Sequence, residues 1–306
     1  MDLIFTCIAV SLIIVMFVLF IIVLGIEEQP HSTWQQPKNE KYNMVTKEQS
    51  AKYNNYFTES KQKEILRLEN LTVVRGRNCV LRKIGLNIYE GERLAIIGES
   101  GAGKSTLVSS IRGEIVPTQG TVIFDGKKLR YDSASLSQHY INVPMIDQSA
   151  SSLVPFHSIL KSIVKQLLVK GMPQDQANDV AYNCLRTMKI EDKVDSLPEQ
   201  LSGGEKQRAV VAKALSMGNS VKLLLADEPT SSLDPPLARD IIKSLTARNF
   251  AIIFITHQIE LVMNDVDRIL LLLQGKLHDV TIIKKKYPRY FTEFPVSGSI
   301  FVTSGL

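Results

Sequence analysis

A glycine-rich loop between an apolar run and a helix-like stretch is the feature that most constrains this chain. Residues 94–97 predict a buried strand, and apolar residues at helical spacing follow from Thr106. Strand, glycine-rich loop and helix together form the setting of a phosphate loop, in which backbone N–H groups and a helix N-terminus face phosphate oxygens. We therefore expect nucleotide phosphates to be bound by Gly98, Glu99, Ser100, Gly101, Ala102, Gly103, Lys104, Ser105 and Thr106.

Two side chains of this loop have expected roles. Lys104 is placed to reach the β- and γ-phosphates, and Ser105 offers a hydroxyl ligand to Mg²⁺. The alternative is a flexible turn that matches by accident, which the spacing allows in roughly one chain in a hundred of this length. The flanking strand and helix favour nucleotide binding.

Composition excludes several other classes of protein. A net charge of +5 over 306 residues, without a basic run interleaved with aromatic residues, argues against nucleic acid as a partner. The three cysteines lie far apart and predict neither a disulfide framework nor a metal site, which suits a reducing compartment. The five histidines show no metal-ligand spacing either.

The N-terminal stretch predicts a membrane span. Residues 3–26 carry no charged side chain, and a helix of that length reaches about 36 Å, enough to cross a bilayer core of about 30 Å. A basic n-region and a small-residue cleavage site are absent, so we favour an uncleaved anchor over a signal peptide or a buried core helix. The lysines at 38, 41, 47 and 52 favour a cytoplasmic location for the part that follows.

The rest of the chain divides by composition and periodicity. Residues 29–64 are polar and predict a linker. Strands are predicted at residues 65–74, 80–89, 94–97, 121–124, 140–146, 222–226, 251–255 and 268–273. Between 148 and 200 only helical patterns occur, at 159–169 and 175–188, which indicates a helical insertion. We therefore expect an α/β fold with a mostly parallel sheet flanked by helices.

Four further motifs follow the phosphate loop in order, and with it they resemble the ATP-binding-cassette (ABC) transporter ATPases. Gln148 matches that family's Q-loop glutamine, and His257, after Ile255-Thr256, matches its H-loop histidine. The signature and Walker B motifs are matched by Leu201-Ser202-Gly203-Gly204-Glu205-Lys206-Gln207-Arg208 and by Leu223-Leu224-Leu225-Ala226-Asp227-Glu228-Pro229, with Ser231-Ser232-Leu233-Asp234 as the D-loop. The resemblance implies a P-loop NTPase cassette with an N-terminal antiparallel β subdomain. We expect an anchor at 1–28, a linker at 29–64, the ATPase domain at 65–280 with its insertion at about 149–200, and a tail at 281–306.

The residue types in these motifs also indicate specific chemical roles. Asp227 and Glu228 end a buried strand, where open α/β sheets bind ligands. Asp227 is expected to hold Mg²⁺ through water, and Glu228 to act as the general base for the attacking water. The resemblance implies that Gln148 contributes to Mg²⁺ and to the attacking water, and that His257 contacts the γ-phosphate.

The signature predicts a second anion site. Ser202, Gly203 and Gly204 head a helix, and local chemistry alone fits an anion-binding N-terminus and an ordinary N-cap equally well. The resemblance implies that they cover ATP held by another subunit, so that two cassettes, identical or different, enclose two nucleotides. Arg75 stands where the family places an adenine-stacking aromatic residue, and it either stacks on the base or is simply exposed.

The resemblance implies an ATPase that energises a membrane transporter with ATP and Mg²⁺. One span cannot enclose a translocation path, so polytopic permease subunits are expected as partners. The opening of the insertion, Gln148 to Pro155 with Ile159 and Ile163 beyond, is similar to peptide and nickel importer ATPases. This favours import of peptides, metal complexes or similar solutes, with a solute-binding protein as a further partner and the ATPase domain anchored at the cytoplasmic side of the cell membrane. An exporter or lipoprotein-releasing ATPase, and an ATP-gated interaction protein, remain alternatives.

Overall fold

The structure is a computed structural model that describes residues 63–281. The predicted membrane span at 3–26 lies outside these residues, as do nearly all of the predicted linker and tail. Among residues 63–281, no helix is both long and apolar enough to cross a membrane.

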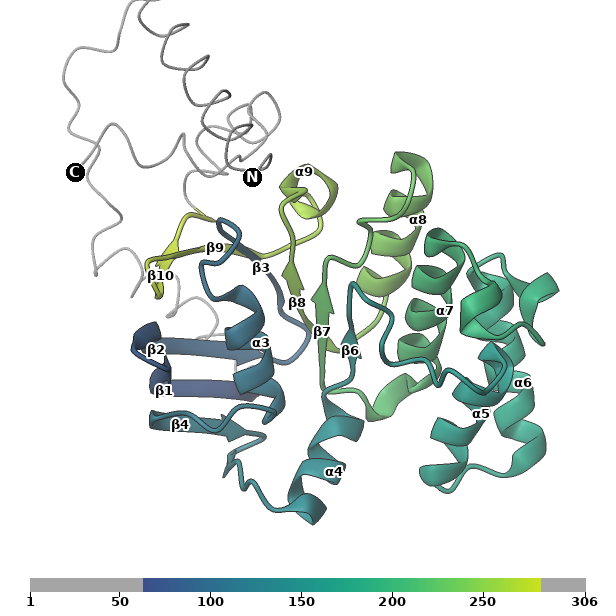
Figure 1. The fold of residues 1–306 in the computed structure, drawn as a ribbon, viewed down its shortest axis with the longest axis horizontal. Helices are drawn as coiled ribbons and strands as arrows, with labels where there is room; N and C mark the ends of the chain where they lie inside the picture. Colours follow the sequence, from purple (N-terminus) through teal and green to yellow (C-terminus); the bar gives the residue numbers. More distant parts are fainter. Residues whose placement is uncertain (1–62, 282–306) are drawn as a thin grey trace, which may run out of the picture. The chain divides into compact units, whose positions relative to one another are not determined.

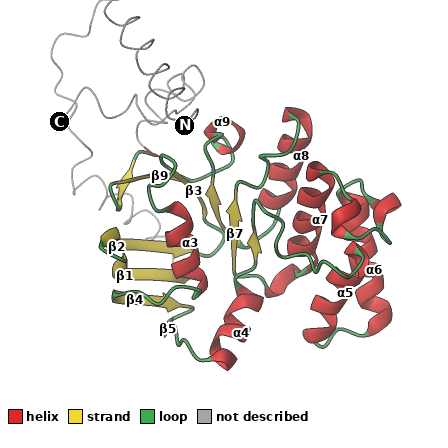
Figure 2. Cartoon of the chain, in the orientation of Figure 1, coloured by secondary structure: helices red, strands yellow, loops and turns green. Residues whose placement is uncertain are grey.

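Two sheets organise the described residues (Figures 1 and 2). The larger sheet has the strand order β10-β9-β3-β8-β7-β6 and is parallel except where β10 pairs with β9. Its strands are β3 (Arg93–Ile97), β6 (Met145–Ile146), β7 (Leu223–Asp227), β8 (Ala251–Ile255), β9 (Arg268–Leu273) and β10 (Lys276–Asp279). The mostly parallel core sheet expected from the sequence is confirmed.

The smaller sheet is antiparallel, with the order β2-β1-β4-β5. It consists of β1 (Glu64–Arg75), β2 (Asn78–Tyr89), β4 (Gln119–Phe124) and β5 (Lys127–Lys128). Gly76 has a φ of 58° in the turn between β1 and β2, a backbone conformation that glycine adopts readily. The antiparallel β subdomain implied by the resemblance is therefore present.

The helices lie around the larger sheet and in the insertion. The insertion contains α5 (Ile159–Val169) and α6 (Gln174–Thr187), which pack against α7 (Gly203–Ser216). The other helices are α3 (Lys104–Arg112), α4 (Ser133–Asn142), α8 (Pro235–Thr246) and α9 (Ile259–Val262), with short 3-10 turns at Glu191–Lys193, Pro198–Gln200 and Gly218–Ser220. The helix predicted at 159–169 is confirmed at both ends. Ile159 and Ile163 are fully buried on its inner face.

Alternate residues of the central strands enter two separate apolar clusters. Leu94 and Leu223 pack with the smaller sheet and α3, whereas Ala95 and Leu224 pack with the helices of the insertion. Successive side chains of a strand point to opposite faces, so a strand buried on both faces is apolar throughout. The larger sheet therefore lies between the two apolar clusters and contributes side chains to both. The loops of the candidate site follow the carboxyl ends of its strands.

One predicted strand is wrong. Residues 140–142, part of the strand predicted at 140–146, end the helix α4, and the strand itself contains only Met145 and Ile146. The carboxylate of Asp132 caps α4 by accepting a hydrogen bond from the Ser135 N–H at 3.0 Å. This N-cap starts a helix that continues into the apolar run, and periodicity alone does not distinguish a short helical run from a strand.

Candidate functional site

The phosphate loop joins β3 to α3, as the sequence predicts. Gly103 is the N-cap of α3 with a φ of 104°, a conformation that favours glycine. A Cβ atom on Gly98 would lie 2.5 Å from the backbone oxygen of Leu272 in β9, so close packing against this strand excludes any side chain there. Glu99, Ser100, Gly101 and Ser105 are exposed, whereas the side chain of Thr106 is buried.

The side chain of Lys104 folds back over the phosphate loop to which it belongs. Its ammonium group donates hydrogen bonds to the carbonyl oxygens of Gly98 at 2.7 Å and Glu99 at 2.8 Å. Burial lowers the pKa of Lys104, and the nearby carboxylates of Glu228 and Asp227 oppose this shift. An ammonium group is therefore held beside the loop that is predicted to bind the phosphates.

Asp227 and Glu228 stand at the carboxyl end of β7. Burial raises the pKa of the Asp227 carboxyl, the charge of Glu228 raises it further, and Lys104 opposes the rise. Glu228 has a φ of 48°, which is sparsely populated for residues other than glycine, and its N–H donates to the Ile255 carbonyl at 2.8 Å. Such backbone strain concentrates at functional sites.

The carboxylate of Glu228 is held by the two residues that follow β8. It accepts hydrogen bonds from the Thr256 hydroxyl at 3.2 Å and from the His257 N–H at 3.1 Å, and its Oε1 lies 2.7 Å from the His257 Nδ1. Glu228 is 12% exposed, whereas the His257 side chain is 60% exposed. Sequence reasoning treated Thr256 only as part of a motif and missed this contact, which follows from the parallel pairing of β7 with β8.

Gln148 lies exposed at the start of the insertion, beside a turn that Asp147 organises. Asp147 accepts hydrogen bonds from the Ser149 hydroxyl and the Ser151 N–H, both at 2.7 Å. Burial works to raise the pKa of Asp147, but these hydrogen bonds outweigh it and lower the pKa. The Lys213 ammonium of α7 donates to the Ser152 carbonyl, which ties the segment that follows Gln148 to the signature helix.

The signature residues form the capped N-terminus of α7. The Ser202 hydroxyl accepts from the Glu205 N–H at 3.3 Å, and the Glu205 carboxylate accepts from the Ser202 N–H at 2.8 Å. This is a capping box, so the N-cap interpretation is confirmed, while anion binding from another subunit stays a prediction. A Cβ atom on Gly204 would lie 3.3 Å from the Ser232 carbonyl oxygen, which places the signature against the D-loop of the same chain.

Arg75 is the residue predicted to contact adenine, and no contact among the described residues joins it to the phosphate loop. Arg75 is exposed at the end of β1. The smaller sheet approaches the loop through Val80 of β2, whose Cγ1 would lie 3.0 Å from a Cβ atom on Gly103. Val80 is thus a site neighbour that sequence reasoning missed, since only the packing of β2 on the loop identifies it.

The oxygen ligands available for a metal fit Mg²⁺. Within residues 63–281 there is no cluster of three or more His, Cys, Asp or Glu side chains that could hold an ion by itself. Mg²⁺ is commonly bound by one or two protein oxygens together with phosphates and water. The exposed Ser105 hydroxyl and the Asp227 carboxylate beside the loop are donors of this kind.

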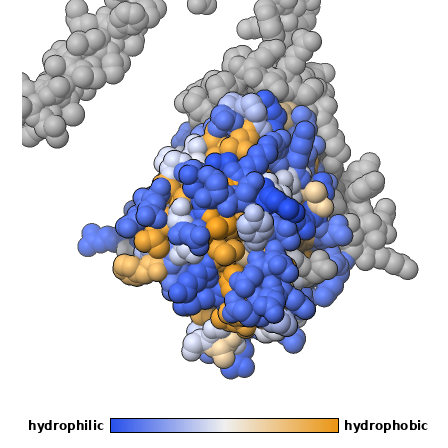
Figure 3. All heavy atoms as spheres, turned by 90° about the vertical axis from the view of Figure 1, so that its right-hand side faces the viewer, coloured by the Kyte–Doolittle hydropathy of each residue, from blue (hydrophilic) through white to orange (hydrophobic). Residues whose placement is uncertain are grey.

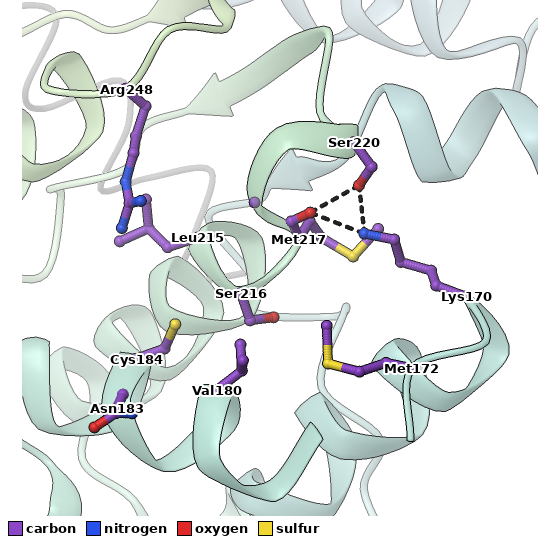
Figure 4. Close-up of a pocket in the computed structure, with 11 residues that line it drawn as sticks. Lys170, Met172, Val180, Asn183, Cys184, Leu215, Ser216, Met217, Ser220 and Arg248 are labelled. Carbon is purple, nitrogen blue, oxygen red and sulfur yellow. Dashed lines mark hydrogen bonds between the residues drawn. The ribbon is translucent and has the colours of Figure 1, made fainter. Parts of the chain in front are cut away.

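A separate hollow of about 500 Å³ lies where α5, α6 and the end of α7 meet (Figure 4). Lys170 reaches across it, and its ammonium donates to the Met217 carbonyl at 2.8 Å and to the Ser220 hydroxyl. None of the predicted site residues lines this hollow.

Comparisons with known proteins agree with these features. Residues 81–231 match the family model described as ABC transporter. The chain is 31% identical over 243 residues to a general L-amino acid transport ATP-binding protein of Rhizobium johnstonii, covering 78% of this chain and 91% of the relative. It is 34% identical over 202 residues to a glutamine transport ATP-binding protein of Geobacillus stearothermophilus, covering 65% and 82% of the two chains.

A solved structure shows the same fold. The chain resembles an ATP-binding cassette dimer in a post-hydrolysis state with ADP and phosphate, with a TM-score of 0.64, 30% identity and coverage of 70% of this chain and 96% of that one. With the phosphate loop, the paired acids of β7 and the capped signature helix in one chain, the protein is an ATPase that binds ATP with Mg²⁺, and it belongs to the ABC transporter family.

Proposed function

We propose that the protein is the ATP-hydrolysing subunit of a membrane importer for amino acids or similar small solutes. The observation that carries this proposal is the similarity, over most of both chains, to an ATP-binding protein of general L-amino acid transport. Peptides and metal complexes, favoured by the sequence motifs, belong to the same class of small polar solutes and stay predictions.

The geometry supports a different role for each of the site residues. Lys104 exchanges the carbonyl oxygens of Gly98 and Glu99 for the β- and γ-phosphates, and backbone N–H groups of the loop are proposed to face the same anion. Mg²⁺, held by Ser105, Gln148 and by Asp227 through water, would neutralise charge on the phosphates. Arg75 is left as a contact for the adenine ring or as an exposed side chain.

Glu228 is the proposed general base. Thr256 and His257 orient its carboxylate, and we propose that this carboxylate accepts a proton from the water that attacks the γ-phosphate. His257, whose imidazole is exposed, is the proposed contact of that phosphate. The positive φ of Glu228 fits a carboxylate that the surrounding strands hold in a fixed orientation.

The proposed partners supply what a single cassette lacks, which is a second signature helix to cover its ATP and a path through the membrane. The N-terminus of α7, with Ser202 and Gly203 exposed and Gly204 half-buried, is proposed to cover ATP held by a second cassette, in a homodimer or a heterodimer. Polytopic permease subunits supply the path through the membrane, and a solute-binding protein delivers the solute. The cassette works at the cytoplasmic side of the cell membrane, with the stretch at 3–26 as its predicted single-pass anchor.

The test is purification of the full-length protein with its polytopic membrane subunits. We expect co-purification, and ATP hydrolysis that rises when the transported amino acid and its binding protein are added to the reconstituted complex. An isolated dimer whose ATPase responds only to a soluble protein would contradict transport and favour the ATP-gated interaction protein.

A further inference from the structure

The hollow where α5, α6 and the end of α7 meet contains none of the predicted nucleotide-site residues. Its volume of about 500 Å³ lies within the range of small-molecule pockets, about 300–1,000 Å³. Met172, Val180 and Leu215 supply apolar side chains to its lining, whereas Lys170 and Arg248 supply positive charge (Figure 4). An apolar lining with a few polar groups is typical of a site for a small organic molecule.

Lys170 brings a half-buried positive charge to the hollow. Its ammonium group donates to the Met217 carbonyl at 2.8 Å and to the Ser220 hydroxyl, and both acceptors are neutral. Burial lowers the pKa of Lys170, and among residues 63–281 no carboxylate opposes this shift. No Asp or Glu of the described chain lines the hollow either. Because a cation that is partly removed from water lacks a counter-ion here, an anion in the hollow would stabilise it.

Arg248 provides a second cation at the hollow. It is exposed, and within the part of the chain that the structure describes its guanidinium group forms no ion pair or hydrogen bond. Burial raises the pKa of the Cys184 thiol, and the charge of Arg248 partly opposes this rise. The guanidinium group therefore lies near the α6 side of the hollow. At neutral pH Cys184 stays an uncharged thiol, so it adds no negative charge that would compete with an anionic ligand.

The apolar part of the lining is accessible from solvent. Met172 and Val180 are half-buried, although both line the hollow. Figure 3 views the side of the molecule on which α5 and α6 lie, and it shows apolar surface among hydrophilic side chains. A ligand with both apolar and charged groups can therefore approach these helices without unfolding them.

We propose that this hollow is a binding site for a small amphipathic anion, namely a carboxylate on a short hydrocarbon chain. The carboxylate faces Arg248 and Lys170, and the hydrocarbon chain lies against Met172, Val180 and Leu215. A planar guanidinium group can pair with both oxygens of a carboxylate, which favours this group over other anions. The inference goes beyond the proposed function and does not depend on it, because no nucleotide-site residue takes part.

Three probes that share an eight-carbon chain test the charge preference on the full-length protein: octanoate, octanamide and octylammonium. Isothermal titration calorimetry measures their binding. We expect octanoate to bind at least about ten-fold more tightly than octanamide, and octylammonium not to bind at the same concentrations. The advantage of octanoate should shrink as the salt concentration is raised.

Two variants locate the site, each with a matched control. Arg248→Gln should weaken octanoate binding about ten-fold, whereas Arg186→Gln, at an exposed arginine of α6 that does not line the hollow, should not change it. Val180→Trp should fill the hollow and abolish binding. Val169→Trp, at a valine of α5 that is 79% exposed and outside the lining, is its control. Thermal unfolding verifies that all four variants are folded.

Cys184 reports occupancy in the unaltered protein. Alkylation at alkaline pH is followed separately for each cysteine by mass spectrometry. We expect saturating octanoate to slow alkylation of Cys184 several-fold and to leave Cys79 unchanged, because Cys79 is also half-buried but lies in β2, outside the lining.

Three outcomes overturn the proposal: equal affinity for octanoate and octanamide, undiminished octanoate binding in folded Val180→Trp, or equal protection of Cys184 and Cys79. Equal losses of binding in Arg248→Gln and Arg186→Gln would likewise remove Arg248 from the site. All of these outcomes leave the proposed function untouched, since that function is tested by co-purification with polytopic subunits and by ATP hydrolysis.

Discussion

Glu228 and His257 lie 29 positions apart in the sequence, yet the Oε1 of Glu228 and the Nδ1 of His257 are 2.7 Å apart in the structure. The two residues follow neighbouring parallel strands, in which Asp227 is paired with Ile255. Because the carboxyl ends of parallel strands meet at one edge of a sheet, the candidate base and its histidine partner are brought together by the sheet itself.

Replacing Glu228 by glutamine should separate binding from hydrolysis. The Glu228→Gln variant keeps the size of the side chain and its contact with Thr256 but cannot accept the proton of the attacking water. We expect ATP to bind normally and phosphate release to fall at least about a hundred-fold, and we expect ATP to trap a dimer that gel filtration detects. Near-normal phosphate release would remove Glu228 from the role of base.

Replacing Lys104 by alanine should abolish ATP binding. The Lys104 ammonium group lies over the loop, and residues 98–106 contain no other lysine or arginine that could supply its charge. Binding of a fluorescent ATP analogue measures the loss, with Lys170→Ala as the control, since Lys170 also donates to a backbone carbonyl group but lies at the separate hollow. An affinity for ATP within a few-fold of the unaltered protein would contradict this role.

Thr256→Val tests the second support of the general base. The valine has the shape of threonine but cannot donate to Glu228 at 3.2 Å or accept from the Gln258 N–H at 2.9 Å. We expect kcat to fall about ten-fold, corresponding to about 1.4 kcal/mol, with little change in KM. Thr246→Val is the matched control because the Thr246 hydroxyl is buried and bonds only within α8. An unchanged kcat would show that His257 alone orients Glu228.

Lys213→Met tests the link between the signature helix and the segment after Gln148. Burial lowers the pKa of both Lys213 and Lys170, and each ammonium group donates to a backbone carbonyl. Replacing either lysine by methionine should therefore reduce the free energy of unfolding by about 1–2 kcal/mol. Only Lys213→Met should also lower kcat several-fold, because only Lys213 holds Ser152. Thermal unfolding and phosphate release measure the two effects, and Lys213→Arg should restore kcat. Equal losses of kcat in both methionine variants would indicate a purely structural role.

A buried ion pair between the first residue of β9 and the residue before β3 makes stability depend on pH. Arg268 is 5% exposed, Glu92 is 1% exposed, and their charged groups are 3.2 Å apart. Burial raises the pKa of Glu92, which Arg268 opposes. We expect Arg268→Met to reduce the free energy of unfolding by about 3–5 kcal/mol at neutral pH, because the Glu92 carboxylate loses its buried partner.

The sign of the pH effect follows from the direction of that shift. A carboxyl whose pKa is raised by folding contributes stability below its unfolded pKa of about 4.3, and this contribution is lost as the pH rises through the folded pKa. Arg268→Met should therefore recover part of its lost stability as the pH falls from neutral toward that range, and Glu92→Gln/Arg268→Met should lack this recovery. Denaturant unfolding at several pH values measures the difference, and a parallel pH profile for the single and double variants would contradict the explanation.

Local patterns predicted elements and motif residues well. The phosphate loop, the Ser202 cap and the bounds of α5 depend on residues close together in the chain, where glycine conformations, capping side chains and helical spacing act. The strand predicted at 140–146 failed because a helix N-cap at Asp132, outside the apolar run, decided its conformation.

The sequence by itself determined the phosphate loop, the order of the motifs and, through their resemblance, the family. Only the tertiary structure decided that Thr256 supports Glu228, that Gly204 lies against Ser232, and that Phe156 is exposed while Ile159 and Ile163 are buried. The physical reason is distance along the chain. Capping and loop geometry are set within a few residues, whereas strand neighbours and the buried face of a helix are chosen by packing between segments that the sequence separates by tens of residues.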